Sequence, residues 1–276
     1  MTAALPTTDR STDLAFAVEL AQRAGRLLTE RYEKVERIDF KSAKDVVTEV
    51  DHLSEALIID AIRAAHPGDG IVAEESGEYN AAAGHAPTAG VGRAWVIDPL
   101  DGTINYANGI PFFCVSIALV DGGRPVVGVV VDPVRGETFA ATEDGPATLD
   151  GRPIATSVKP KLSDFVVSMA LSGRGLISRA RAVRKAIRVS RSMGSAALAL
   201  AYVGNGRFDA FVQQGGLSSW DIAAAGLIAK RGGATLTDLA GGKWFDVAGK
   251  PRSIGVLAAP AEHHAELLRL VRGDRP

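Results

Sequence analysis

The chain has 276 residues, of which 46% are hydrophobic, and its 31 basic and 32 acidic residues leave a net charge of -1. A chain of this length and apolar content can bury one large core, or the cores of two closely packed subdomains. A nearly neutral charge gives no reason to expect binding to nucleic acid or to an anionic membrane, so neither is expected as a partner.

The single cysteine bears on the cellular location of the protein, because one cysteine excludes an internal disulfide and fits a reducing environment. Residues 1–10 lack the basic and apolar segments of a signal peptide, and no apolar run reaches membrane-spanning length. We therefore expect a cytoplasmic protein with a flexible tail over residues 1–10.

The first elements in chain order are two helices, which apolar periodicity predicts over 12–32 and 50–65. A short strand then leads into a glycine- and alanine-rich loop over 75–92. Asp51 falls near the start of the second helix, where an acid supports the first helical turn. Glu74 follows the strand directly, where an acid is usually only solvated.

The most informative stretch is a turn that follows the next strand, with the sequence Asp98-Pro-Leu-Asp101-Gly102-Thr. Pro99 keeps Asp98 out of a helix and Gly102 allows a tight turn, so two carboxylates project into one small loop. Like charges this close repel unless protons or cations intervene, which favours a bound divalent metal. Oxygen ligands favour magnesium or manganese over zinc. The alternative is that both aspartates only form the turn.

A meander follows this turn. Strands are predicted over 113–120 and 125–131, joined by an Asp-Gly-Gly hairpin signal, with a third strand near 137–141. Cys114 lies in the first of these strands and is predicted to be a packed core thiol.

Strands and helices alternate beyond residue 150, which predicts a layered second subdomain. The predicted ranges are strands 165–169, 188–190, 208–212, 234–238 and 254–258 and helices 178–187, 195–203, 220–231 and 261–272. Asp221 opens the third of these helices, where N-capping is its simplest role. The change of pattern divides the chain into subdomains 11–150 and 151–276, which we expect to form one globule.

Basic residues crowd the stretch 178–191, but no aromatic residues lie between them, so a solvated helix face is expected rather than a nucleic-acid site. The five histidines show no metal-ligand spacing and are predicted to lie on the surface.

Taken in this order, these acidic segments resemble the inositol monophosphatase family of magnesium-dependent, lithium-sensitive sugar phosphatases. The resemblance covers nearly the whole chain and rests on the Asp-Pro-hydrophobic-Asp-Gly-Thr motif with a later Trp-Asp at Trp220 and Asp221. It implies an α/β (α+β) fold, a layered αβαβα sandwich, and usually a homodimer.

The resemblance also implies a ligand set for two or three magnesium ions. Glu74, Asp98 and the backbone carbonyl of Leu100 match the ligands of one metal. Asp98, Asp101 and Asp221 match those of a second, so Asp98 would bridge the two. Most of these ligands lie in the first subdomain, and Asp221 lies in the second.

Catalytic roles follow from the same resemblance. Thr103 and Glu74 would position and activate the attacking water, and Asp51 matches a buried acid near that water. The backbone N–H groups of Gly102 and Thr103 would hold the phosphate at a helix start. Lys41 matches a lysine near the outer metal, although a solvated lysine is nearly as good an interpretation.

Substrate contacts are implied for Gly194, Ser195 and Ala196, where the family has a Gly-Thr-Ala segment. The alternative, that Gly194 and Ser195 start a helix, is compatible with this role. Gln214 lies seven positions before Asp221, where inositol-specific members carry a glutamate, so strong selectivity for inositol is in doubt.

The predicted function is magnesium-dependent hydrolysis of a small phosphomonoester, with inositol 1-phosphate as the first candidate. Histidinol phosphate, fructose 1,6-bisphosphate and 3′-phosphoadenosine 5′-phosphate are alternatives, because relatives that use them share the same acids. A phosphate-binding regulatory protein is the alternative of another class.

Overall fold

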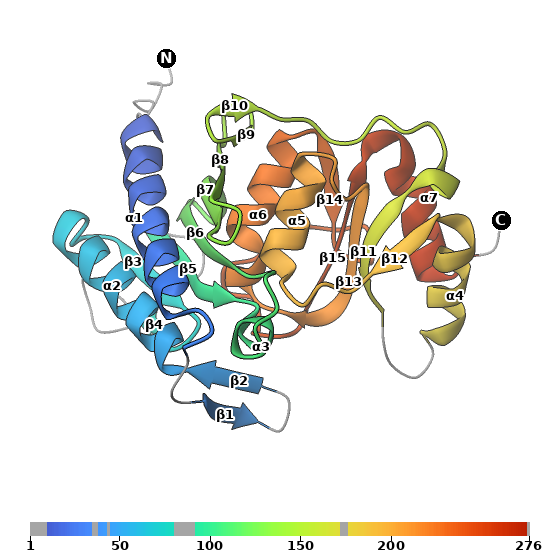
Figure 1. Ribbon diagram of the computed structural model, residues 1–276. Helices are drawn as coiled ribbons and strands as arrows, with labels where there is room; N and C mark the ends of the chain where they lie inside the picture. The colour runs from blue at the N-terminus through green and yellow to red at the C-terminus, as the bar shows by residue number, and fades with distance from the viewer. Residues whose placement is uncertain (1–9, 35–37, 43–44, 80–91, 172–175, 275–276) are drawn as a thin grey trace, which may run out of the picture.

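The structure is a computed structural model that describes residues 10–34, 38–42, 45–79, 92–171 and 176–274 (Figure 1). The predicted tail lies outside the described residues except for Arg10, which begins the first helix. None of the helices in the described part of the chain is long and apolar enough to cross a membrane.

The first half of the chain builds an eight-stranded sheet with the order β10-β9-β8-β7-β6-β5-β3-β4 and two helices beside it. Its elements, with a separate β1–β2 hairpin, are α1 (Arg10–Arg31), β1 (Ile38–Ser42), β2 (Asp45–Thr48), α2 (Glu49–Ala65), β3 (Gly70–Ala73), β4 (Gly77–Tyr79), β5 (Arg93–Asp101), α3 (Thr103–Ala107), β6 (Cys114–Asp121), β7 (Arg124–Asp132), β8 (Glu137–Thr142), β9 (Thr148–Leu149) and β10 (Arg152–Pro153).

The second half builds a five-stranded sheet with the order β12-β11-β13-β15-β14. Its elements are η1 (Leu162–Asp164), β11 (Val166–Ala170), α4 (Ile177–Ala186), β12 (Val189–Arg191), α5 (Ala196–Gly204), β13 (Ala210–Leu217), α6 (Ser219–Arg231), β14 (Ala234–Thr237), β15 (Ile254–Pro260) and α7 (Ala261–Arg272). Helices α5 and α6 contact strands of both sheets, so no gap in the packing separates the two halves of the chain. The division into subdomains near residue 150 therefore stays a prediction.

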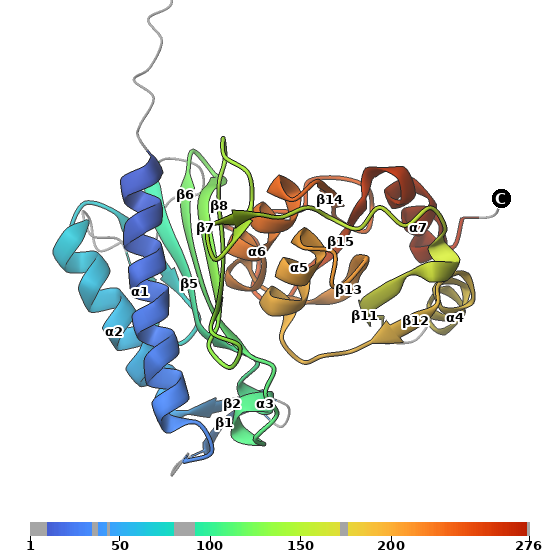
Figure 2. The same ribbon diagram turned by 45° about the horizontal axis from the view of Figure 1, so that its top comes forward.

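Five layers result from this arrangement. Helices α1 and α2 cover one face of the first sheet, α5 and α6 pack between the sheets, and α4 and α7 cover the outer face of the second sheet (Figures 1 and 2). Three apolar cores fill the interfaces: one lies under α1 and α2, one surrounds α5 and α6 and contacts both sheets, and one lies under α4 and α7. The predicted αβαβα sandwich is therefore confirmed.

Close packing of the middle layer depends on a glycine. A Cβ at Gly128 in β7 would come within 2.8 Å of the Ala224 carbonyl oxygen in α6. Because real Cβ atoms do not approach a backbone oxygen this closely, only glycine lets α6 lie against the sheet here. This contact fixes α6, whose first turn carries Asp221, relative to the strands that carry the other acids.

The helices and strands predicted beyond residue 93 are present, with their ends displaced by a few residues. The β1–β2 hairpin was not predicted, and β4 occupies part of the predicted loop 75–92. Gly77, at a φ of 80°, lets the chain turn back so that β4 pairs antiparallel with β3. Residues 80–91 of that loop lie outside the described residues.

Surface placement of the histidines is wrong for His263 and His264, which are buried in the first turns of α7. Nε2 of His263 donates to the Lys159 carbonyl at 2.9 Å, and Nε2 of His264 lies 3.1 Å from the Thr237 hydroxyl. Both rings find polar partners as α7 packs on the second sheet, which is why they can be buried. His85 lies outside the described residues.

Candidate active site

Three carboxylates meet where the two halves of the chain join. Asp98 and Asp101 lie at the end of β5, and Asp221 lies in the first turn of α6. One oxygen from each lies within 4.8 Å of the others, and Asp98 is only 1% exposed. The structure thus brings together residues that are 120 or more positions apart in the chain.

Local capping and site geometry coexist at Asp221. Its Oδ2 accepts a hydrogen bond from the Ser218 backbone N–H at 2.5 Å, as part of a capping box at the start of α6. Capping uses one carboxylate oxygen, so the other is available to the acidic cluster. The capping interpretation and the metal interpretation are therefore both compatible with the structure.

Asp98 is the best evidence that the cluster suits a cation. Its Oδ1 accepts the Leu100 N–H at 3.1 Å, whereas its buried Oδ2 has no hydrogen-bond partner among the described residues. A buried oxygen without a partner costs free energy unless an ion or a water satisfies it. Burial raises the pKa of Asp98 well above its ordinary value, and the charges of Glu74, Asp101 and Asp221 raise it further.

A divalent cation would satisfy the unpartnered Asp98 oxygen and would also offset the repulsion between the neighbouring carboxylates. The donors are all oxygen atoms, which suits magnesium or manganese. Burial also raises the pKa of Asp221 well above its ordinary value, with Asp101 and Glu74 as further causes. The residues present therefore fit the metal that the resemblance implies.

Glu74 follows β3 and lines the same cavity as Asp101 and Asp221. Its backbone is fixed from α2, because Glu55 accepts hydrogen bonds from the Glu75 and Ser76 N–H groups at 2.8 Å each. Glu55 is buried at 3% exposure and was not singled out in the sequence. Its signal was its position one helical turn after Asp51, which places both acids on one face of α2.

Asp51 and Thr103 form the second cluster. Asp51 Oδ2 accepts hydrogen bonds from Thr48 N–H at 2.8 Å and from the Thr48 hydroxyl at 2.6 Å. The Thr103 hydroxyl lies 2.9 Å from Asp51 Oδ1 and 3.0 Å from the Leu100 carbonyl oxygen, and it can donate to either. Asp51 therefore caps α2 with one oxygen and faces Thr103 with the other.

Gly102 connects the two clusters. Its φ of 100° lies in the region that favours glycine, and a Cβ there would come within 3.2 Å of Ser195 and Phe113. The tight turn brings Asp101 on one side and Thr103 on the other into the same small volume. Lys41 lies on β1 in a stretch whose side chains are outside the described part of the structure.

A loop from the second half of the chain closes the site. Gly194, at a φ of 87°, packs against the Asn105 side chain, where a Cβ would come within 2.7 Å of the amide atoms. Nδ2 of Asn105 donates to the Met193 and Phe112 carbonyls at 2.7 Å. Gly194, Ser195 and Ala196 all line the cavity, and their contact with substrate stays a prediction from the family resemblance.

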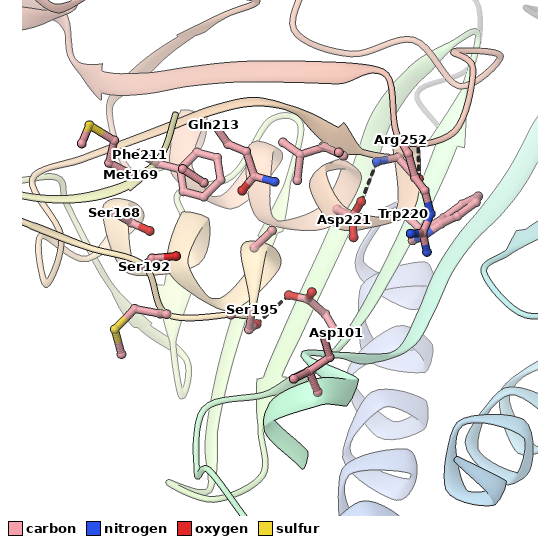
Figure 3. A pocket seen from close by; sticks show the side chains of 18 of the residues that line it. Asp101, Ser168, Met169, Ser192, Ser195, Phe211, Gln213, Trp220, Asp221 and Arg252 are labelled. Carbon is pink, nitrogen blue, oxygen red and sulfur yellow. Dashed lines mark hydrogen bonds between the residues drawn. The ribbon is translucent and has the colours of Figure 1, made fainter. Parts of the chain in front are cut away.

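The cavity itself has a volume of about 340 Å³ and opens beside the acidic cluster (Figure 3). Asp101 and Asp221 lie on one side, and the serines Ser168 and Ser192 lie on the other (Figure 3). This size is near the lower end for ligand pockets and suits a small polar molecule.

Gln214 does not reach this cavity. It is exposed, and Gln213 lines the cavity instead (Figure 3). Nε2 of Gln213 donates to the Gly215 carbonyl at 3.3 Å, which leaves its side-chain oxygen as an acceptor. The structure thus places the neighbouring glutamine where the sequence predicted Gln214.

Arg252 also lines the cavity and was not anticipated. It has a φ of 60°, its N–H donates to the Ser218 hydroxyl at 3.0 Å, and its carbonyl accepts the Gly216 N–H at 2.9 Å. Its charge acts to lower the pKa of Asp221. The positive φ of a non-glycine residue is the structural signal, and it is not readable from the sequence.

Stability without metal should depend on pH. Because the raised pKa values of Asp98 and Asp221 let the folded state hold protons that the unfolded state releases, stability should fall as pH rises above the ordinary value of 3.8. Thermal unfolding in a chelator, from about pH 4 to about pH 7, measures this, and excess magnesium should restore most of the loss at the higher pH. A pH-independent melting temperature in chelator would contradict it.

Comparison with known proteins agrees with the geometry. A model of the inositol monophosphatase family matches residues 9–274. "Nus factor SuhB" of Escherichia coli is 36% identical over 259 residues, covering 89% of this chain and 94% of that protein. A "fructose-1,6-bisphosphatase/inositol-1-monophosphatase" of Thermotoga maritima is 37% identical, covering 83% and 85%. The solved suhB protein of Bartonella henselae superposes with a TM-score of 0.86 at 32% identity, covering 96% and 100%.

Fold and site together define a layered α/β protein with an acidic cavity whose carboxylates could hold a metal ion. The chain belongs to the inositol monophosphatase family, whose members are metal-dependent.

Proposed function

We propose that the protein hydrolyses a small phosphomonoester with magnesium, with inositol 1-phosphate, converted to myo-inositol and phosphate, as the first candidate substrate. The observation that carries this proposal is the buried, unpartnered Oδ2 of Asp98 amid three further acids beside a small polar cavity. Family membership supports the reaction class.

Each acid has a proposed role at the metals. Glu74, Asp98 and the Leu100 carbonyl would hold one ion, and Asp98, Asp101 and Asp221 would hold a second. When bound, the metal lowers the pKa of a coordinated water and neutralises charge on the phosphate. Manganese could serve in the same oxygen site.

Thr103 would orient the attacking water. When its hydroxyl donates to Asp51, the lone pairs of Thr103 are left to accept a hydrogen bond from that water. Glu74 would take the water's other proton. The N–H groups of Gly102 and Thr103 at the start of α3 are the proposed donors to the phosphate.

The substrate is tested by phosphate release from inositol 1-phosphate, histidinol phosphate, fructose 1,6-bisphosphate and 3′-phosphoadenosine 5′-phosphate, each with and without magnesium. Magnesium-dependent release that strongly favours inositol 1-phosphate supports the proposal. Preference for another member of the panel keeps the reaction and replaces the substrate. No release from any of them would refute the phosphatase proposal.

A regulatory role is the second candidate. It is favoured by the name "Nus factor" of the relatives, which suggests action through partners. The presence of all four proposed metal-site acids, Glu74, Asp98, Asp101 and Asp221, together with Thr103, supports catalysis over a purely regulatory role. Homodimer formation and a cytoplasmic location are likewise proposed, from family membership and the single buried cysteine.

Selectivity is expected to depend on Gln213. Gln213→Glu should raise the kcat/KM ratio of inositol 1-phosphate over fructose 1,6-bisphosphate by about tenfold, because a carboxylate accepts hydroxyl hydrogen bonds more strongly and repels a second phosphate. Gln214→Glu is the matched control, since Gln214 is exposed and outside the cavity. Kinetics on both substrates measure the ratio. A larger shift from Gln214→Glu would show that the cavity wall has been misplaced.

A further inference from the structure

Ser195 makes a contact that its predicted substrate role does not explain. Its hydroxyl donates to Asp101 Oδ2 at 2.5 Å (Figure 3), although the two residues are 94 positions apart. The same oxygen accepts the Ala197 N–H at 2.6 Å. Ser195 is also the N-cap of α5 and accepts the Leu198 N–H at 3.3 Å.

These bonds use most of the hydrogen-bonding capacity of the Ser195 hydroxyl. A hydroxyl has one proton and two lone pairs, and the proton is given to Asp101 while one lone pair is given to α5. Both residues are buried, Ser195 at 2% and Asp101 at 7% exposure. The hydroxyl is therefore directed at the acidic cluster and not at a sugar in the cavity.

The effect on Asp101 is to fix its carboxylate plane. Two hydrogen bonds from α5 hold Oδ2, so the direction of Oδ1 is set by the first turn of this helix. The thiol of Cys114 adds only a weak contact, with Sγ 3.8 Å from Oδ2. Asp101 thus enters the cluster already oriented by a residue from the other half of the chain.

We infer that Ser195 is a positioning residue that acts through Asp101 on the divalent cation held by Asp98, Asp101 and Asp221. This inference rests on the proposed function. Hydrogen bonds that orient metal ligands typically change metal affinity by about 10- to 100-fold.

The test measures metal binding without substrate. Calorimetric titration with magnesium, and with manganese, is compared for the wild-type chain and for Ser195→Ala, Ser195→Gly and Ser195→Thr. Ser195→Ala should weaken cation binding by about tenfold or more. Ser195→Thr, which keeps the hydroxyl, should bind the cations about as tightly as the wild type. Ser195→Gly removes the hydroxyl while largely keeping N-cap preference, so it should bind cation as weakly as Ser195→Ala. Circular dichroism verifies folding of each variant.

Steady-state kinetics then separate an effect of the Ser195 variants on magnesium binding from an effect on substrate binding. The magnesium concentration for half-maximal activity should rise in Ser195→Ala, while the substrate KM at saturating magnesium stays close to the wild-type value. Ser192→Ala is the matched control for metal affinity, because Ser192 lines the same cavity without a hydrogen bond to Asp101. Its cation affinity should be unchanged.

Two results would overturn the inference. Unchanged cation affinity in Ser195→Ala, with a raised substrate KM, would show that the hydroxyl serves the substrate directly. Weakened affinity in Ser195→Thr equal to that of Ser195→Ala would show that packing, and not the hydroxyl, matters. A third result, failure of the wild-type chain to bind either cation, would refute the proposed function together with this inference. Cation binding by the wild type therefore separates a failure of the inference alone from a failure of the proposed function.

Discussion

Asp98→Asn is expected to lower turnover by at least about a thousandfold, because it removes the charge proposed to bridge two cations, and several kcal/mol of charge stabilisation is lost with it. The fold should persist, since asparagine has nearly the same shape and can still accept the Leu100 N–H. Initial rates at saturating magnesium, with circular dichroism of the same samples, measure both effects.

Stability provides an independent readout for the same variant. The Asp98 carboxylate is 1% exposed and is repelled by Glu74, Asp101 and Asp221. Removing its charge should leave the metal-free protein at least as stable as the wild type at neutral pH, and magnesium should stabilise it less. A variant that is inactive but not destabilised would separate site chemistry from misfolding.

Asp69→Asn is the matched control. Asp69 accepts hydrogen bonds from Arg93 and Trp95 near the opposite end of β5, and it does not line the cavity. The change should weaken an ion pair and lower stability slightly while leaving turnover unchanged. Near-normal turnover in Asp98→Asn, or an equal loss in Asp69→Asn, would contradict the two-metal assignment.

Most of the fold could be predicted because hydrophobic periodicity is local. Helices such as α1 and α2 and the β6–β7 hairpin follow from patterns of a few residues and from the glycine pair 122–123. The buried Cys114 followed from the same patterns. The alternation of strands and helices after residue 150 predicted a layered second half, whereas the αβαβα order of the layers was implied by the family resemblance.

The cavity wall could not be predicted by counting along the chain. Pairing of β13 with β15 shifts between Gln213 and Leu217, where Gly215 and Gly216 have φ values of 68° and 76°. Such an irregularity changes which side chain faces the cavity, so counting back from Asp221 selected Gln214 where the structure presents Gln213.

Convergence of distant residues was also beyond the sequence patterns. Asp51 and Thr103 are 52 positions apart, and their hydrogen bond depends on how α2 packs against the end of β5. From the residues alone, Asp51 was expected only to support the first turn of its helix by its charge. The structure shows that one oxygen of Asp51 caps α2 while the other faces Thr103. Only the family resemblance indicated a role near Thr103.

Thr103→Ala should lower kcat by about 10²- to 10³-fold, in the range for loss of proton-transfer catalysis. The change removes the hydroxyl that lies 2.9 Å from Asp51 and is proposed to orient the attacking water. Magnesium affinity should be unchanged, because the Thr103 side chain is not among the proposed ligands. Steady-state kinetics and calorimetric magnesium titration of the same variant measure the two quantities.

Thr103→Ser is the matched control and should keep most of the activity, because the hydroxyl can still donate to Asp51 while only a methyl group is lost.

Asp51→Asn should also lower kcat, because it changes the acceptor of the Thr103 hydroxyl, and it should cost about 1 kcal/mol of stability because the capping box of α2 is disrupted. If Thr103 and Asp51 act as a unit, the double variant should be little slower than the worse single variant. Fully additive losses in kcat would show that the two side chains act independently, and unchanged kcat in Thr103→Ala would remove Thr103 from the mechanism.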